Sequence, residues 1–148
     1  MSKTRILILA LCLAAILASP LFAATYTIAN KDGVAVSTTS DNPAFADAGL
    51  KGWTVQTFSS AGVDWFVFKL AKGADLYPFH ASPDEWIGFI LEGSGQVLLG
   101  DAANVQKGVV NFKKGDFLMF GADTVHAWKN GAAETQILFL KATPPKAE

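Results

Sequence analysis

The chain of 148 residues contains two histidines, His80 and His126, and each lies in a short apolar segment. Trp86 follows the first histidine by six residues, and Trp128 follows the second by two. Alternate residues of a β-strand face the same side of a sheet, so the spacing predicts which side chains point together. The expected faces are Leu76, Pro78 and His80 in the first segment, Trp86, Gly88 and Ile90 in the second, and His126 with Trp128 in the third.

These residue types suit two kinds of chemistry. Imidazole nitrogens bind transition metals and exchange protons near neutral pH, whereas indole rings form apolar walls that carry one N–H donor. If the three segments are neighbouring strands of one barrel, both imidazoles converge at its mouth with the indoles of Trp86 and Trp128. Asp84 and Glu85 follow Pro83 and are interpreted as solvated turn residues.

The elements that must position these side chains are short strands. Runs rich in Val, Ile, Phe, Trp and Thr alternate with Gly, Asp and Asn, which predicts an all-β fold. Lys31–Gly52 is the least strand-like part and is expected to be a loop with one helical turn. The expected strands are Thr25–Ala29, Trp53–Phe58, Val63–Ala71, Leu76–His80, Trp86–Glu92, Gly95–Gly100, Gly108–Phe112, Phe117–Phe120, Val125–Lys129 and Thr135–Ala142.

The segments Gly73–Gly93 and Gly115–Asn130 resemble the two sequence motifs of the cupin family. The resemblance implies a small antiparallel jelly-roll barrel, placed at residues 53–142 behind an N-terminal strand and loop extension at residues 24–52. In the second motif, the family's glycine, proline, second glycine, histidine and asparagine positions hold Gly115, Gly121, Asp123, His126 and Asn130.

The resemblance also implies a site for a divalent transition metal (Fe, Mn, Ni or Zn), with His80 as the first ligand and His126 as the last. Ser82 stands where the family has a second histidine, and Trp86 stands where it has a carboxylate. Catalytic zinc uses three protein ligands, and non-haem iron uses two histidines and one carboxylate. Glu85 could complete such a set only through a bulge or a shifted turn, because it is one residue out of phase with the inward row.

Three functions follow from these substitutions. The leading hypothesis is a pocket that binds a small neutral molecule, carbohydrate-like or aromatic, beside a degenerate metal site. The alternative is a metal-dependent dioxygenase, isomerase or lyase that uses His80, Glu85 and His126. A third is a purely structural or interaction barrel, in which Trp86 fills the interior and no open pocket remains at the mouth. The binding residues of the leading hypothesis are His80, Ser82, Trp86, His126 and Trp128.

The N-terminus predicts export. Lys3 and Arg5 precede an apolar run from Ile6 to Ala18 and then small residues, which is the layout of a secretory signal peptide over residues 1–23. Its removal leaves 10 of the 12 basic residues against 13 acidic ones, with no arginine and no stable membrane anchor. This balance argues against nucleic acid as a partner. The expected location is the periplasm or the exterior, and residues 143–148 are expected to be a disordered tail.

Several expected strands are apolar on both faces, namely residues 65–68, 87–91 and 137–140. A strand with two apolar faces is covered on both sides in folded proteins. One small barrel has a single interior, so the second face needs another cover. The sequence therefore predicts a homodimer whose sheets pack against each other.

Overall fold

The computed structural model describes residues 24–60 and 63–142. The predicted signal peptide and C-terminal tail lie outside these residues. The described ranges contain strands and turns, and they hold no helix long and apolar enough to cross a membrane. The strands are β1 (Ala24–Lys31), β2 (Val34–Asp41), β3 (Ala46–Asp47), β4 (Trp53–Ser60), β5 (Val63–Leu70), β6 (Tyr77–His80), β7 (Glu85–Glu92), β8 (Ser94–Gly100), β9 (Gln106–Lys113), β10 (Phe117–Phe120), β11 (His126–Asn130) and β12 (Thr135–Ala142).

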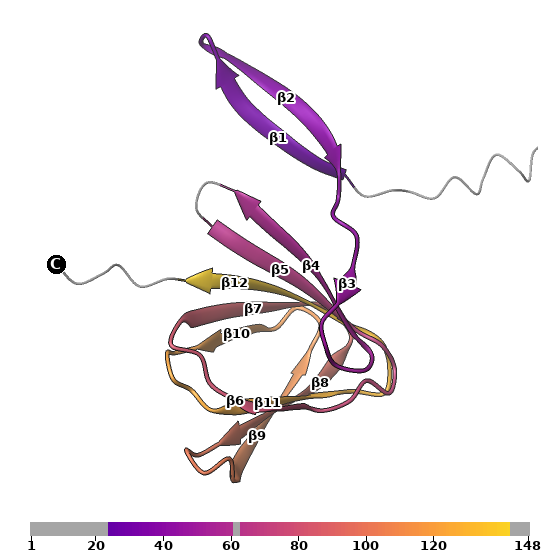
Figure 1. Ribbon diagram of the computed structural model, residues 1–148, viewed down its shortest axis with the longest axis vertical. Coiled ribbons are helices and arrows are strands. Elements are labelled where there is room, and N and C mark those ends of the chain that lie inside the picture. Colours follow the sequence, from indigo (N-terminus) through magenta and orange to yellow (C-terminus); the bar gives the residue numbers. More distant parts are fainter. Residues whose placement is uncertain (1–23, 61–62, 143–148) are drawn as a thin grey trace, which may run out of the picture. The chain divides into compact units, whose positions relative to one another are not determined.

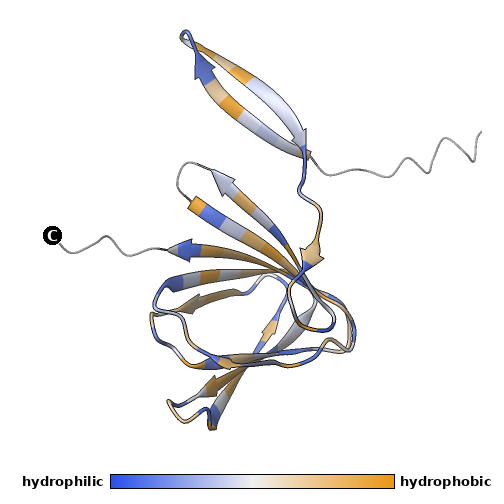
Figure 2. Cartoon of the chain, viewed as in Figure 1, coloured by the Kyte–Doolittle hydropathy of each residue, from blue (hydrophilic) through white to orange (hydrophobic). Residues whose placement is uncertain are grey.

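The chain divides into two compact units, the first ending at Asn42 and the second beginning at Pro43. The described part of the first unit is an antiparallel hairpin of β1 and β2, in which Lys31 lies opposite Val34 next to the turn (Figure 1). Both strands of the hairpin contain hydrophobic and polar residues (Figure 2), and in β2 the hydrophobic residues lie at the turn end, at 34–36. Tyr26 is 68% exposed in this hairpin.

The predicted loop with a helical turn over Lys31–Gly52 is wrong, because residues 34–41 and 46–47 form β2 and β3. The turn between β1 and β2 explains the difference. Asp32 and Gly33 have φ values of 54° and 85°, and two residues with positive φ form the tight turn whose twist matches a hairpin. The side-chain oxygen of Asn30 also accepts a hydrogen bond from the Gly33 N–H at 2.8 Å.

The second unit is an antiparallel barrel of two sheets, as predicted. The six-stranded sheet has the order β10-β7-β12-β5-β4-β3, and the four-stranded sheet has the order β6-β11-β8-β9. The two sheets face each other in Figure 1. Because β3 pairs with β4, the six-stranded sheet includes residues before Trp53, where the barrel was expected to begin.

The hydrophobic core lies between the two sheets. On β12, Ile137 and Phe139 are buried while the residues beside them are partly exposed, which is the alternation of a strand with one inward face. Gly88 on β7 allows the Phe139 ring to cross the interior, since a Cβ at this glycine would lie 2.8 Å from the ring atom Cε1. The core cluster consists of Trp53, Leu70, Ile90, Val97, Phe112, Phe120, Trp128, Ile137 and Phe139.

Candidate functional site

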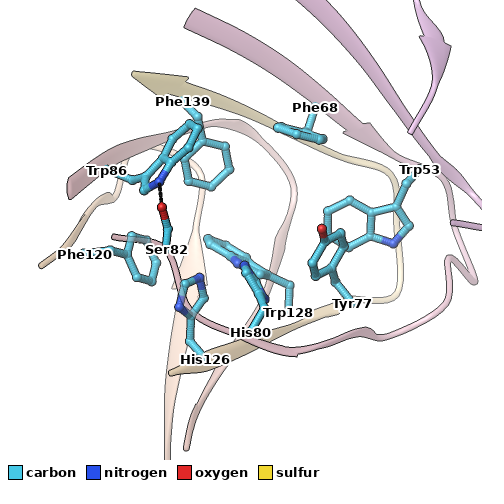
Figure 3. Close-up of a pocket in the computed structure, with 10 residues that line it drawn as sticks. All are labelled: Trp53, Phe68, Tyr77, His80, Ser82, Trp86, Phe120, His126, Trp128 and Phe139. Carbon is cyan, nitrogen blue, oxygen red and sulfur yellow. Dashed lines mark hydrogen bonds between the residues drawn. The ribbon is translucent and has the colours of Figure 1, made fainter. Parts of the chain in front are cut away.

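A cavity of about 230 Å³ opens inside the barrel, where side chains from both sheets meet (Figure 3). Its wall is largely aromatic, and its polar groups are few, which is the usual composition of a small-molecule site. None of its lining residues is acidic, lysine or arginine. The lining residues are Trp53, Phe68, Tyr77, His80, Ser82, Trp86, Phe120, His126, Trp128 and Phe139.

The two histidines are neighbours at this cavity. Strands β6 and β11 pair in a register that sets His80 opposite His126, and the centres of the two imidazole rings are 4.4 Å apart. Phe120 stacks on His126 with a centre-to-centre distance of 4.4 Å, and Tyr77 meets His80 edge to face at 4.7 Å. Aromatic contacts therefore hold both imidazoles in place.

Both imidazoles are held in the same tautomer by the backbone. The Nδ1 atom of His80 lies 3.0 Å from the carbonyl oxygen of Pro78, and Nδ1 of His126 lies 2.9 Å from the carbonyl oxygen of Thr124. A carbonyl oxygen only accepts hydrogen bonds, so each Nδ1 must carry the proton and donate it. In the neutral form of each ring, the other nitrogen, Nε2, is an acceptor.

His126 favours its neutral form. Burial lowers its pKa below the usual 6.5, and the nearby His80 lowers it further, while the hydrogen bond to the Thr124 carbonyl acts in the opposite direction. The side chain is 7% exposed, and a charged ring at this depth would lose most of its hydration. At neutral pH His126 therefore presents a lone pair to the cavity.

Trp86 points into the cavity from β7, and its polar group is already occupied. The indole N–H donates a hydrogen bond to Oγ of Ser82 at 3.0 Å, which also accepts one from the backbone N–H of Asp84 at 3.1 Å. The carbonyl oxygen of Ser82 accepts a third hydrogen bond from the backbone N–H of Asp123 at 2.7 Å. These bonds tie the loop before β7 to the loop before β11 and orient Trp86.

Glu85 does not join the two histidines. It is the first residue of β7, exposed, and one step out of phase with Trp86, so its carboxylate is not among the groups that line the cavity. Across the described residues, no three His, Cys, Asp or Glu side chains are placed to hold a metal ion. A neutral serine hydroxyl is a poor metal ligand, so the two imidazoles are one ligand short of the three in catalytic zinc sites. They also lack the carboxylate of non-haem iron sites. These donors therefore do not fit the divalent transition metal that the resemblance to cupins implies.

The structure also differs from the predicted face of β6. Tyr77 and His80 both line the cavity, although their spacing would put them on opposite faces of a regular strand. The register between β6 and β11 shifts between His126 and Trp128, and this irregularity turns Tyr77 inward in place of its neighbours. Leu76 is 46% exposed. The lining residues that the sequence reasoning did not name are Trp53, Phe68, Tyr77, Phe120 and Phe139.

The two antiparallel sheets that face each other place this unit in the jelly-roll class of β-barrels, and the barrel holds a pair of neighbouring histidines. Searches with family models and of curated proteins by sequence found no match. Solved structures, in contrast, share the architecture, and they show that this barrel has the cupin fold.

Three of these structures illustrate the likeness. An RmlC-like cupin from Shewanella frigidimarina has a TM-score of 0.56 at 16% identity, over 70% of this chain and 86% of that one. A cupin 2 conserved barrel domain protein from Rhodopseudomonas palustris has a TM-score of 0.54 at 15% identity, over 84% and 74%. The polyketide cyclase RemF from Streptomyces resistomycificus has a TM-score of 0.54 at 18% identity, over 66% and 70%. At these identities the likeness establishes the fold, and function depends on the site.

Proposed function

We propose that this protein binds a small neutral ring-shaped molecule, carbohydrate-like or aromatic, in the barrel cavity, and that it does so without a metal. The observation that carries the proposal is the lining itself. Aromatic rings surround two imidazoles and a serine hydroxyl, and no ionised carboxylate, ammonium or guanidinium group lines the space. An ion would leave water here without a charged partner, which is strongly unfavourable, whereas a neutral ring gains from contact with the aromatic walls.

The size of the cavity supports a single ring. An apolar cavity of roughly 150 Å³ holds benzene, and the present space is about 230 Å³. The added volume leaves room for a few substituents on a six-membered ring. It falls below the roughly 300–1,000 Å³ of pockets for drug-sized ligands. Mono- or bicyclic molecules are therefore expected, and oligosaccharides would have to lie partly outside.

The test is binding of cyclohexanol, phenol and a neutral monosaccharide, measured by calorimetry and by the rise in melting temperature. A ligand that binds the folded state stabilises it by mass action, about 2.7 kcal/mol at a hundred times its dissociation constant. The variant Ser82→Leu places a branched side chain in the cavity and should abolish binding. The matched variant Ser82→Ala loses the same hydroxyl without filling the space, so it should bind more weakly than the unaltered protein, because Trp86 loses its hydrogen bond, but far more tightly than Ser82→Leu. Equal binding by both variants would place the ligand elsewhere and overturn the proposal.

The rival function is a metal-dependent enzyme, and metal analysis of the purified protein distinguishes it. A tightly held Fe, Mn, Ni or Zn ion at one per chain would refute binding without a metal. Loss of that ion in Glu85→Gln would then assign the carboxylate as a ligand. The exposed position of Glu85 leads us to expect no stoichiometric metal and no effect of this substitution.

We also propose that the protein acts in the periplasm or outside the cell. The support is the basic and apolar order of residues 1–23, which is that of a secretory signal peptide. Mass spectrometry of the protein from fractionated cells should find a chain that starts after Ala23 or Ala24. A full-length chain in the cytoplasmic fraction would contradict this location.

We further propose a homodimer through the outer face of the six-stranded sheet. Phe117 and Met119 on β10 are 66% and 79% exposed there, and Phe117 packs against Phe89 of β7 with ring centres 4.5 Å apart. On the same sheet, Phe58 stacks on Trp65 at 5.7 Å. These residues lie on five neighbouring strands, β10-β7-β12-β5-β4. At about 4.8 Å between strands and about 3.3 Å per residue, the strands offer a face on the order of 600 Å², compared with roughly 800 Å² per partner in a standard interface.

Sedimentation velocity tests the dimer. The double variant Phe117→Asp, Met119→Asp puts charges on this face and should sediment as a monomer, whereas Val109→Asp charges an exposed site on the other sheet and should stay dimeric. If the unaltered protein sediments as a monomer at micromolar concentration, the dimer is wrong. If both altered proteins stay dimeric, the dimer uses another surface.

A further inference from the structure

Two polar atoms inside the cavity have no partner in the described part of the chain. His126 and Trp128 are 7% and 4% exposed, and neither Nε2 of the first nor the indole N–H of the second makes a hydrogen bond to a described residue. The atom Oδ1 of Asn130 is the one side-chain polar atom found both fully enclosed and unpartnered among these residues. Nε2 of His126 and the Trp128 N–H must therefore border open space, which the cavity provides.

These polar atoms determine which hydrogen-bonding groups a ligand must carry. In the neutral form of each ring, the hydrogen bonds from Nδ1 to backbone carbonyls leave Nε2 as an acceptor on His80 and on His126. The ring centres lie 4.4 Å apart, so a ligand needs two donors close together to satisfy both. The N–H of Trp128, beside the pair in Figure 3, needs an acceptor in the same place.

Hydroxyl groups meet both demands, because each one donates one hydrogen bond and accepts others. Ketones, ethers and carboxylates cannot donate to the imidazoles, and an ammonium group cannot accept from Trp128. Hydroxyls on adjacent ring carbons stand close enough to reach two neighbouring imidazoles, whereas hydroxyls on opposite ring carbons point apart.

We infer that the ligand is a cyclic vicinal diol, with one hydroxyl on Nε2 of His80 and the other between Nε2 of His126 and the N–H of Trp128. The inference rests on the proposed binding function and adds the ligand's chemical class. The carbon ring then lies among the aromatic walls, where it excludes water from these hydrogen bonds and strengthens them.

Two isomers provide a matched test. Cyclohexane-1,2-diol and cyclohexane-1,4-diol have the same atoms, and cyclohexanol lacks one hydroxyl. The dissociation constant of each is measured by titration of the ¹⁵N-labelled protein, with the Trp128 indole signal as the local probe. The 1,2-diol should bind about tenfold more tightly than either comparison ligand, which is the effect of one well-made hydrogen bond. The 1,2-diol should move the Trp128 N–H signal to markedly lower field.

Two variants of His80 test the assignment of its nitrogen. His80→Phe keeps a ring but removes the acceptor, and should reduce the 1,2-diol to the affinity of cyclohexanol. His80→Gln can return an oxygen near the place of Nε2 and should restore part of the preference. Binding of cyclohexanol by each variant shows that the cavity is intact.

The outcomes separate the two proposals. If all three ligands bind the unaltered protein with equal affinity, the diol inference is overturned and the proposed binding function stands. If none of them binds, and phenol and the monosaccharide also fail, both are overturned. A preference for the 1,2-diol that persists unchanged in His80→Phe overturns the role given to the histidine pair.

Discussion

Replacing Gly93 with alanine should destabilise the barrel far more than the same change at Gly115. Both glycines have a left-handed backbone, with φ values of 82° and 91°, and an alanine in this conformation costs about 1 kcal/mol. Around Gly115 an added Cβ meets nothing within 4 Å, whereas at Gly93 it would contact the carbonyl oxygen of Glu134 and lie 2.7 Å from Cα of Thr135.

The contacts at Gly93 are with backbone that cannot rotate away. Overpacking of this kind costs about 1–3 kcal/mol, so Gly93→Ala should lose about 3 kcal/mol in total and Gly115→Ala about 1 kcal/mol. For a domain of this size, 1 kcal/mol corresponds to about 4 °C in melting temperature. The expected decreases are therefore about 12 °C and about 4 °C.

Thermal and urea unfolding of both variants, followed by circular dichroism, measures the difference. Gly115→Ala is the matched control because it carries the same φ penalty without the steric contact. Equal decreases in the two variants would show that β12 does not pass against Gly93 as described. That result would refute the packing between the turn after β7 and the start of β12.

Three further predictions concern the cavity. Burial holds the pKa of His126 below its usual 6.5, so the unfolded chain binds the proton more readily than the folded one. The melting temperature should therefore be highest above about pH 6.5 and fall as pH drops through the folded-state pKa. The variant His126→Phe should flatten this profile. Trp86→Phe loses the hydrogen bond to Ser82 and should lower the unfolding free energy, measured in urea, by about 1 kcal/mol. The control is Trp65→Phe, whose indole N–H bonds to no described residue, and the loss in Trp86→Phe should exceed the loss in this control by that amount. Phe139→Ala should lower it by about 3–5 kcal/mol, because its ring fills the core; a loss under 1 kcal/mol would contradict that packing.

The barrel strands could be predicted because their signals are local. Apolar alternation and glycine or asparagine at the turns indicate where each strand lies. The predicted segments 117–120 and 135–142 match β10 and β12 in full, while the ends of others differ by one or two residues, as in β9 and β11. The inward position of Trp86 likewise follows from the two-residue period of β7. The same period leaves the Glu85 carboxylate on the outside. The alternation along β7 therefore determines that an indole ring, and not a carboxylate, faces the cavity.

The missed features depend on departures from that period or on distant partners. Tyr77 reaches the cavity through a register shift between β6 and β11, and its own segment carries no signal for such a shift. Phe68 and Phe139 line the cavity from neighbouring strands of the opposite sheet, a position that only the strand order determines. The β1–β2 turn was a different omission, since Asp32-Gly33 is a local hairpin signal.

The placement of the tryptophans gives the protein a built-in optical reporter. Trp53, Trp86 and Trp128 line the cavity, and they are three of the four tryptophans in the chain. Indole fluorescence responds to water and to neighbouring groups, so binding of a ligand in the cavity should change the wavelength or the intensity of the protein's tryptophan emission. Libraries of unlabelled compounds can be screened on this signal alone, and Trp65, outside the cavity lining, supplies a background that replacement by phenylalanine would remove.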